Sequence, residues 1–195
     1  MYSSRNINKD IIFNIYNESR TVFKLTDLAM LFGETNYGSL NKRLNYYVQN
    51  GKLLNPRKGI YAKSGYNPLE LACLLFTPSY ISLEYVLQKS GITFQFNSQI
   101  TSVSYLSRNV IIDGSSLAYR KIKDEILVDT SGITVDDEGI HIATPERALL
   151  DTLYLNSNYY FDNLNPINVE QIMKLLPIYQ SKTMNQRVSK LFSHG

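Results

Sequence analysis

The most informative segment of this chain is residues 37–62, YGSLNKRLNYYVQNGKLLNPRKGIYA. Apolar residues in its first half recur at the i, i+4, i+7, i+8 spacing of an amphipathic helix: Leu40, Leu44, Tyr47 and Val48. We expect this helix over 37–50, where Asn-Gly ends it. Two short apolar runs, 52–54 and 60–62, flank the polar turn 55–59 and predict a hairpin with a basic tip.

The residues before this segment predict further elements of the same unit. Apolar residues at helical spacing indicate a helix over about 8–18, and 21–23 read as a short edge strand. A second short helix opens near Leu25 and ends at Gly33. The order helix, strand, helix, short turn, helix, hairpin is that of a winged helix-turn-helix.

In a winged helix, the second helix of the turn motif enters the DNA major groove and the hairpin contacts neighbouring phosphates. The candidate DNA-binding residues are therefore Tyr37, Ser39, Asn41, Lys42, Arg43, Tyr46, Gln49, Lys52, Arg57 and Lys58. Arg43 can bind guanine through two hydrogen bonds, Asn41 or Gln49 can bind adenine, and the lysines add affinity that depends on salt. The alternative is that this polar surface is the ordinary solvated face of a helix.

The charge is distributed unevenly along the 195 residues. The whole chain carries +3, but residues 1–63 hold ten Lys/Arg and four Asp/Glu, which gives +6. Residues 64–195 hold ten Lys/Arg and thirteen Asp/Glu, which gives −3. Because phosphate neutralisation needs clustered cations, this division favours a DNA-binding domain over 1–63 joined to a second domain over 64–195.

The second domain is expected to mix helices and antiparallel strands. The capping pattern Asn67-Pro-Leu-Glu70 predicts the first of its helices. The expected helices are 68–76, 82–90, 145–155, 168–176 and 183–192, and the expected strands are 94–105, 110–112, 117–122, 133–135 and 140–142. The predicted fold class is therefore α+β, with an N-terminal winged helix-turn-helix and a mixed α/β C-terminal domain.

Signals for catalysis or cofactors are weak. Cys73 is the single cysteine, which excludes an intramolecular disulfide and a cysteine-cluster metal site. His141 and His194 lack zinc-site spacing, and the acidic run 136–138 precedes a glycine as in a hairpin turn. We therefore expect no catalytic residue, no metal and no cofactor. The first residues lack the apolar stretch of a signal peptide and no run reaches about 20 apolar residues, so a cytoplasmic protein without membrane contact is expected.

One group of residues raises the possibility of an enzyme. Gly114-Ser115, followed by Asp124-Glu125 and Asp129, faintly resembles the arrangement of nucleotidyltransferases. Two-metal chemistry needs carboxylates that alternate along one strand, whereas adjacent carboxylates point to opposite faces. The metal-binding pair is missing, which argues against this activity.

Three segments carry a family resemblance: NGKLL (50–54) with GIY (59–61), PSYISLEYVL (78–87) with SGI (90–92), and IATPERALLDTLY (142–154). Together they resemble the AbiEi family, the antitoxins of bacterial type IV toxin–antitoxin systems, over roughly residues 10–155. The resemblance implies an N-terminal domain that binds the operator of its own operon. It also implies a C-terminal domain that neutralises a nucleotidyltransferase-like toxin without binding it directly.

The leading hypothesis is thus a non-enzymatic transcriptional autorepressor and antitoxin whose partner is double-stranded DNA, with its oligomeric state left open. The alternatives are a protein-interaction adaptor or a general transcriptional regulator that uses a winged helix, and a nucleotidyltransferase.

Overall fold

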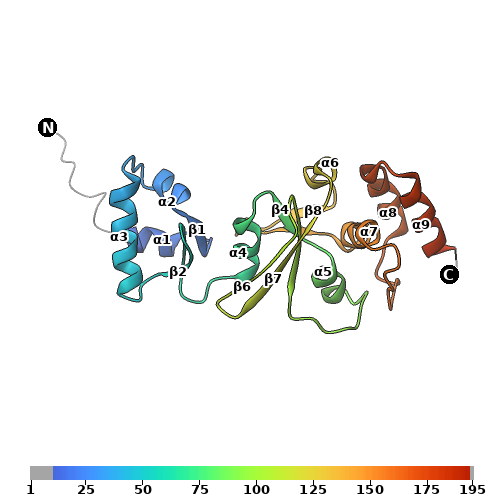
Figure 1. Cartoon of the computed structure of the whole chain (residues 1–195), viewed down its shortest axis with the longest axis horizontal. Helices are drawn as coiled ribbons and strands as arrows, with labels where there is room; N and C mark the ends of the chain where they lie inside the picture. The colour runs from blue at the N-terminus through green and yellow to red at the C-terminus, as the bar shows by residue number, and fades with distance from the viewer. Residues whose placement is uncertain (1–10, 194–195) are drawn as a thin grey trace.

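The structure is a computed structural model that describes residues 11–193. It is elongated, with the N-terminal elements at one end of the long axis and the C-terminal helices at the other (Figure 1). The first three residues of the helix expected over 8–18, and His194, lie outside the described residues.

The first unit contains three helices and three strands among the residues described. They are α1 (Ile11–Asn17), β1 (Val22–Lys24), α2 (Leu25–Leu31), α3 (Tyr37–Gln49), β2 (Leu54–Arg57) and β3 (Ile60–Ala62). The strands form an antiparallel sheet of order β1-β3-β2, with Phe23 opposite Tyr61. Leu40 and Leu44 of α3 are fully buried, and they pack with Ile15 into one core.

The hairpin begins two residues later than expected. Asn55, Pro56 and Arg57 belong to β2 rather than to the turn, and the turn consists of Lys58 and Gly59. Proline is tolerated because β2 is the edge strand of its sheet. The Asn55 side chain also bridges the hairpin, since its Nδ2 donates to the carbonyls of Arg57 at 3.0 Å and Ile60 at 2.7 Å.

The second unit is built on a six-stranded mixed sheet. Its strands are β4 (Ser79–Ile81), β5 (Ile100–Ser104), β6 (Arg108–Ile112), β7 (Ser115–Lys121), β8 (Ile133–Val135) and β9 (His141–Ala143), in the order β6-β7-β5-β4-β9-β8. Its helices are α4 (Pro68–Leu75), α5 (Glu84–Lys89), α6 (Asp124–Leu127), α7 (Pro145–Leu155), α8 (Val169–Leu175), the 3₁₀ helix η1 (Leu176–Tyr179) and α9 (Lys182–Phe192). The β4–β9 and β5–β7 pairs are parallel and the others antiparallel, so the chain is an α+β protein.

Three expectations for the second unit were wrong in detail. The strand expected over 94–105 covers only 100–104, because the amides of Phe94 and Asn97 donate to the side chains of Asp162 and Gln88 instead of to a neighbouring strand. Strand β4 and helix α6 were not expected at all. The helix expected over 82–90 covers only Glu84–Lys89 (α5), and it begins after Leu83 at φ +61°.

Helix α7 forms where a helix was expected, over 145–155, and most of it is buried. Every residue from Arg147 to Leu153 is buried. Thr144 caps the helix by accepting a hydrogen bond from the Arg147 amide at 3.3 Å, and Pro145 occupies the first turn.

A buried polar network joins α7 to the rest of the second unit. Arg147 and Asp151 form an ion pair at 3.3 Å with both side chains fully buried. The Asp151 carboxylate also accepts from the hydroxyls of Ser82 at 2.8 Å, Tyr80 at 3.0 Å and Tyr179 at 2.6 Å. Burial raises the pKa of the Asp151 carboxyl, and Arg147 and these hydroxyl donors oppose that rise.

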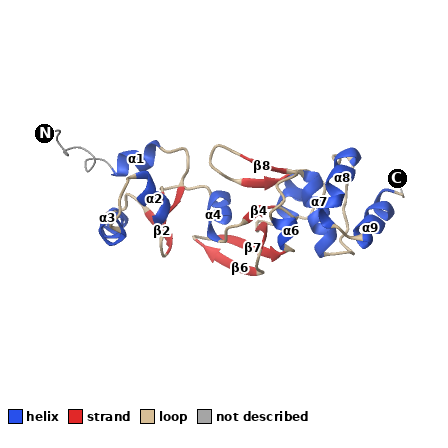
Figure 2. Cartoon of the chain, turned by 90° about the horizontal axis from the view of Figure 1, so that it is seen from above, coloured by secondary structure: helices blue, strands red, loops and turns tan. Residues whose placement is uncertain are grey.

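The two units meet at α4, which lies between the first sheet and the strands of the second unit (Figure 2). Glu70 of α4 is buried and receives three hydrogen bonds from β1 and the residue before it. Its carboxylate accepts from the Thr21 amide at 2.7 Å, the Thr21 hydroxyl at 2.6 Å and the Val22 amide at 2.9 Å. Because Val22, Ile60 and Ala62 also pack into the core of the second unit, apolar and polar contacts both hold the interface.

Candidate nucleic-acid interface

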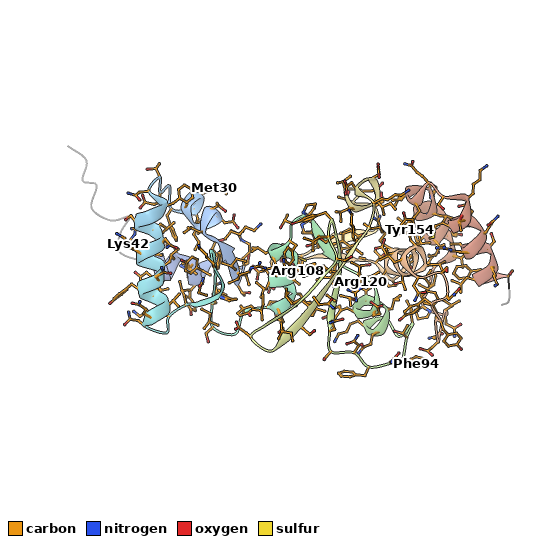
Figure 3. The ribbon with its side chains drawn as sticks, in the orientation of Figure 1. Met30, Lys42, Phe94, Arg108, Arg120 and Tyr154 are labelled. Carbon is orange, nitrogen blue, oxygen red and sulfur yellow. The ribbon has the colours of Figure 1, made fainter. Side chains whose placement is uncertain are left out.

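Helix α3 presents a polar face on the outer end of the molecule. Asn36 caps it by accepting a hydrogen bond from the Ser39 amide at 2.9 Å, and Gly51 at φ +68° follows its end. With Leu40 and Leu44 on the buried side, the opposite side carries exposed residues: Ser39, Lys42, Tyr46 and Gln49. Figure 3 shows Lys42 on the side of α3 that faces away from the rest of the chain.

A groove of about 540 Å³ lies between α3 and the tip of the β2–β3 hairpin. Tyr37, Asn41 and Asn45 line it from the helix, and Lys58 and Gly59 line it from the hairpin turn. A groove that holds asparagine side chains between a helix and a basic hairpin tip is the arrangement expected for a surface that contacts nucleic acid.

Tyr61 organises the polar side chains in this groove. Its hydroxyl lies 2.6 Å from Asn41 Oδ1 and 3.0 Å from Asn45 Oδ1, and it can donate to either. Burial raises the pKa of Tyr61, so the hydroxyl stays protonated. Within residues 11–193 the amide nitrogens of Asn41 and Asn45 donate no hydrogen bond, which leaves them as donors for a ligand.

Three exposed lysines lie on α3 and the segment that follows it. They are Lys42 on α3, Lys52 just after it, and Lys58 at the hairpin tip. None of them forms an ion pair with another described residue. Their charges are therefore available to phosphate groups, whose binding by lysine is electrostatic and independent of sequence.

The two arginines of the candidate set are engaged within the chain. Arg43 forms an ion pair with Glu34 in the turn before α3. The Arg57 guanidinium lies 5.4 Å from the centre of the Phe76 ring, which belongs to the second unit. Both side chains thus have partners that a base or phosphate would have to displace.

Three residues of the groove were missed by the sequence interpretation: Asn45, Asn55 and Tyr61. Asn45 was accessible to it, because it lies one helical turn after Asn41 and shares that face of α3. The roles of Asn55 and Tyr61 depend on the hairpin register, in which Leu54 pairs with Ala62 and Arg57 with Ile60. The strand boundaries predicted from the sequence do not give this register.

The second unit brings together no acidic cluster for metal chemistry among the residues described. No group of three His, Cys, Asp or Glu side chains there could hold a metal ion. Asp124 and Glu125 lie exposed in the first turn of α6, and Gly114-Ser115 lies at the β6–β7 turn rather than beside them. Asp136 stabilises the β8–β9 turn by accepting from the amides of Glu138 and Ile140.

Cys73 is buried, and we expect it to react slowly with thiol reagents. Burial raises the pKa of its thiol from 9.0 to about 11. At pH 8 the thiolate, which is the reactive form, is therefore about a hundredfold scarcer than in a thiol of pKa 9.0. The rate of reaction with a thiol reagent should rise about tenfold per pH unit as thiolate forms. The release of nitrothiobenzoate from Ellman's reagent measures this rate. A native rate equal to that of the protein unfolded in urea would contradict the expectation.

No helix within residues 11–193 combines the length and the apolar composition that a bilayer crossing requires.

The fold and the surface described above define an α+β protein with a basic N-terminal unit. Its structure is similar to the crystal structure of the RV2827C protein from Mycobacterium tuberculosis, with a TM-score of 0.54 and 15% sequence identity. The alignment covers 93% of this chain and 74% of the mycobacterial one, so the overall fold is shared across both units. Comparisons by sequence found no protein family and no curated protein that match the chain.

Proposed function

We propose that this chain is a DNA-binding transcriptional regulator. In this proposal the first unit is a winged helix-turn-helix, α3 is the recognition helix and the β2–β3 hairpin is the wing. The observation that carries it is the groove between α3 and the hairpin tip, which places the amides of Asn41 and Asn45 beside Lys58, a lysine without an ion pair among residues 11–193.

Double-stranded DNA fits this surface better than a single strand does. An α-helix fills the B-DNA major groove, and the amides of Asn41 and Asn45 can recognise adenine there. Lys42, Lys52 and Lys58 then lie where a helix and a wing contact phosphates on either side of the groove. Tyr37 and Tyr46 are exposed on α3, but the Tyr46 ring packs edge-on against Tyr47 at 5.7 Å, which is not the parallel platform on which unpaired bases stack.

From the resemblance to the AbiEi family we further propose that the chain represses its own operon in the cytoplasm. In the same proposal it counteracts a nucleotidyltransferase-like toxin without catalysis of its own. The resembling segments 78–87 and 142–154 supply Tyr80, Ser82, Arg147 and Asp151 to the buried network. We infer that they matter to the antitoxin role by maintaining the fold of the second unit.

The lysines provide the test of DNA binding. We expect Lys42→Ala, Lys52→Ala and Lys58→Ala together to weaken binding to the DNA upstream of the gene by about a hundredfold. The slope of log affinity against log salt should fall by about one for each lysine, because each phosphate contact releases counterions. A mobility-shift titration at several salt concentrations measures both quantities.

The matched control replaces three exposed lysines of the second unit, Lys121→Ala, Lys123→Ala and Lys174→Ala together, and should leave affinity and slope unchanged. Equal losses in both sets would indicate a nonspecific effect of net charge, and unchanged binding in the triple variant would refute the proposed surface.

The antitoxin role needs a separate experiment. If the gene beside this one encodes a nucleotidyltransferase, its expression should arrest growth of a host, and co-expression of this chain should restore growth. If growth arrest persists when this chain and the neighbouring protein are present at equal levels, the antitoxin role is contradicted. The DNA-binding proposal is not affected by that result.

A further inference from the structure

A pocket of about 490 Å³ lies between the two units. Arg20, Lys24 and Asp27 line it from the first unit, and residues of α4, β4, α6 and the β8–β9 hairpin line it from the second. The volume falls within the range of about 300–1,000 Å³ that is typical of small-molecule sites, which often form where two units meet.

Much of the pocket wall is apolar. Leu74 of α4, Leu127 at the end of α6 and Ile133 of β8 contribute to it. Val128 also lines the pocket and is 66% exposed, which places an apolar side chain at the solvent boundary. Such a wall suits an apolar ligand body, since burial of apolar surface on both sides favours binding.

The carboxylates that line the pocket already have partners. Glu70 accepts three hydrogen bonds from Thr21 and Val22, and Glu138 accepts from Asn67 at 2.8 Å. Asp27 lies 3.9 Å from Arg20 and accepts from the Lys24 amide.

Lys24 lines the same pocket, and no described carboxylate lies within ion-pair distance of its ammonium. Its Nζ donates to the Thr77 hydroxyl at 3.3 Å, and it forms no ion pair within residues 11–193. A lysine ammonium carries three donors, so two remain for a ligand. His141, which also lines the pocket, is exposed and adds no negative charge.

We propose that this pocket binds a small amphipathic anion, with its carboxylate or sulfonate on Lys24 and its apolar body against Leu74, Leu127 and Ile133. This site is distinct from the DNA-binding surface, and the proposal does not depend on that function.

Anilinonaphthalene sulfonate, whose fluorescence rises in apolar surroundings, is a suitable probe. We expect Lys24→Gln to weaken its binding roughly tenfold, because one charge-assisted contact is lost while a polar side chain remains at the position. Phenylnaphthylamine has the same rings without the sulfonate, and its binding should be unchanged. Lys42→Gln on α3 is the matched control and should affect neither probe.

Position 128 provides an independent test, because an exposed substitution there leaves the core intact. Val128→Glu should weaken binding of the sulfonate probe, Val128→Lys should strengthen it, and the neutral probe should respond alike to both. The proposal is overturned if the sulfonate probe does not bind, if Lys24→Gln and Lys42→Gln weaken it equally, or if the two substitutions at position 128 act alike on it.

Discussion

Replacing Arg147 with methionine should lower the free energy of unfolding by about 3–5 kcal/mol, because it leaves the Asp151 carboxylate buried without its cation. Both side chains are fully buried, so water cannot replace the lost partner. Arg147 also donates to the carbonyls of Ser131 at 2.8 Å and Ile126 at 2.7 Å, and these acceptors would lose their donor. Urea unfolding followed by circular dichroism measures the loss.

The loss should depend on pH in a definite direction. Burial raises the pKa of Asp151 and Arg147 opposes that rise, so the pKa in the folded variant should be higher still. The folded variant then keeps a proton that the unfolded chain releases above about pH 4, and its stability falls as pH rises. The deficit relative to the unsubstituted protein should therefore be largest at neutral pH and shrink toward pH 4.

Arg187→Met is the matched control for this prediction. Arg187 is half-buried and donates to the carbonyls of Leu153 and Tyr154 at the end of α7, and it pairs with no carboxylate among the residues described. Its loss should cost about 1 kcal/mol and show no such pH dependence. Equal losses for the two arginines, or a deficit for Arg147→Met that does not change with pH, would show that the ion pair is not the source of the effect.

This network illustrates what could be predicted from the sequence and what could not. The helix over 145–155 followed from local signals, namely a capping threonine, a proline in the first turn and a run of apolar residues. The buried role of Arg147 did not, because its partners come from distant segments. Tyr80 lies 67 residues before it in the sequence, and the Ile126 carbonyl lies 21 residues before it.

The candidate interface divides in the same way. The helical face of α3 was predicted because a period of 3.6 residues is a local property of the sequence. The partners of Arg43 and Arg57 depend on how the turn before α3 and the second unit approach these side chains, which no spacing within 37–62 encodes. The boundary of β2 was predicted incorrectly because Pro56 was assigned to a turn. Proline ends most strands, but it is tolerated in an edge strand such as β2.

Glu70→Ala should separate the stability of the first unit from that of the second. The substitution leaves the amides of Thr21 and Val22 and the Thr21 hydroxyl without their acceptor, at a cost of about 3 kcal/mol in total. Because these hydrogen bonds join β1 and the residue before it to α4, the loss should appear first as local opening of residues 11–62. Hydrogen exchange followed by mass spectrometry should show faster exchange in peptides of the first unit and unchanged protection in α7.

Glu138→Ala is the control at the same interface. Glu138 accepts a single hydrogen bond from the Asn67 side chain and is partly exposed, so water can replace it and exchange should change little. If Glu70→Ala accelerates exchange equally in both units, the molecule opens as one cooperative body. The first unit then does not unfold separately from the second. Faster exchange confined to the first unit would instead show that the buried carboxylate protects the first unit against local opening, since the apolar contacts of Val22, Ile60 and Ala62 are untouched by the substitution.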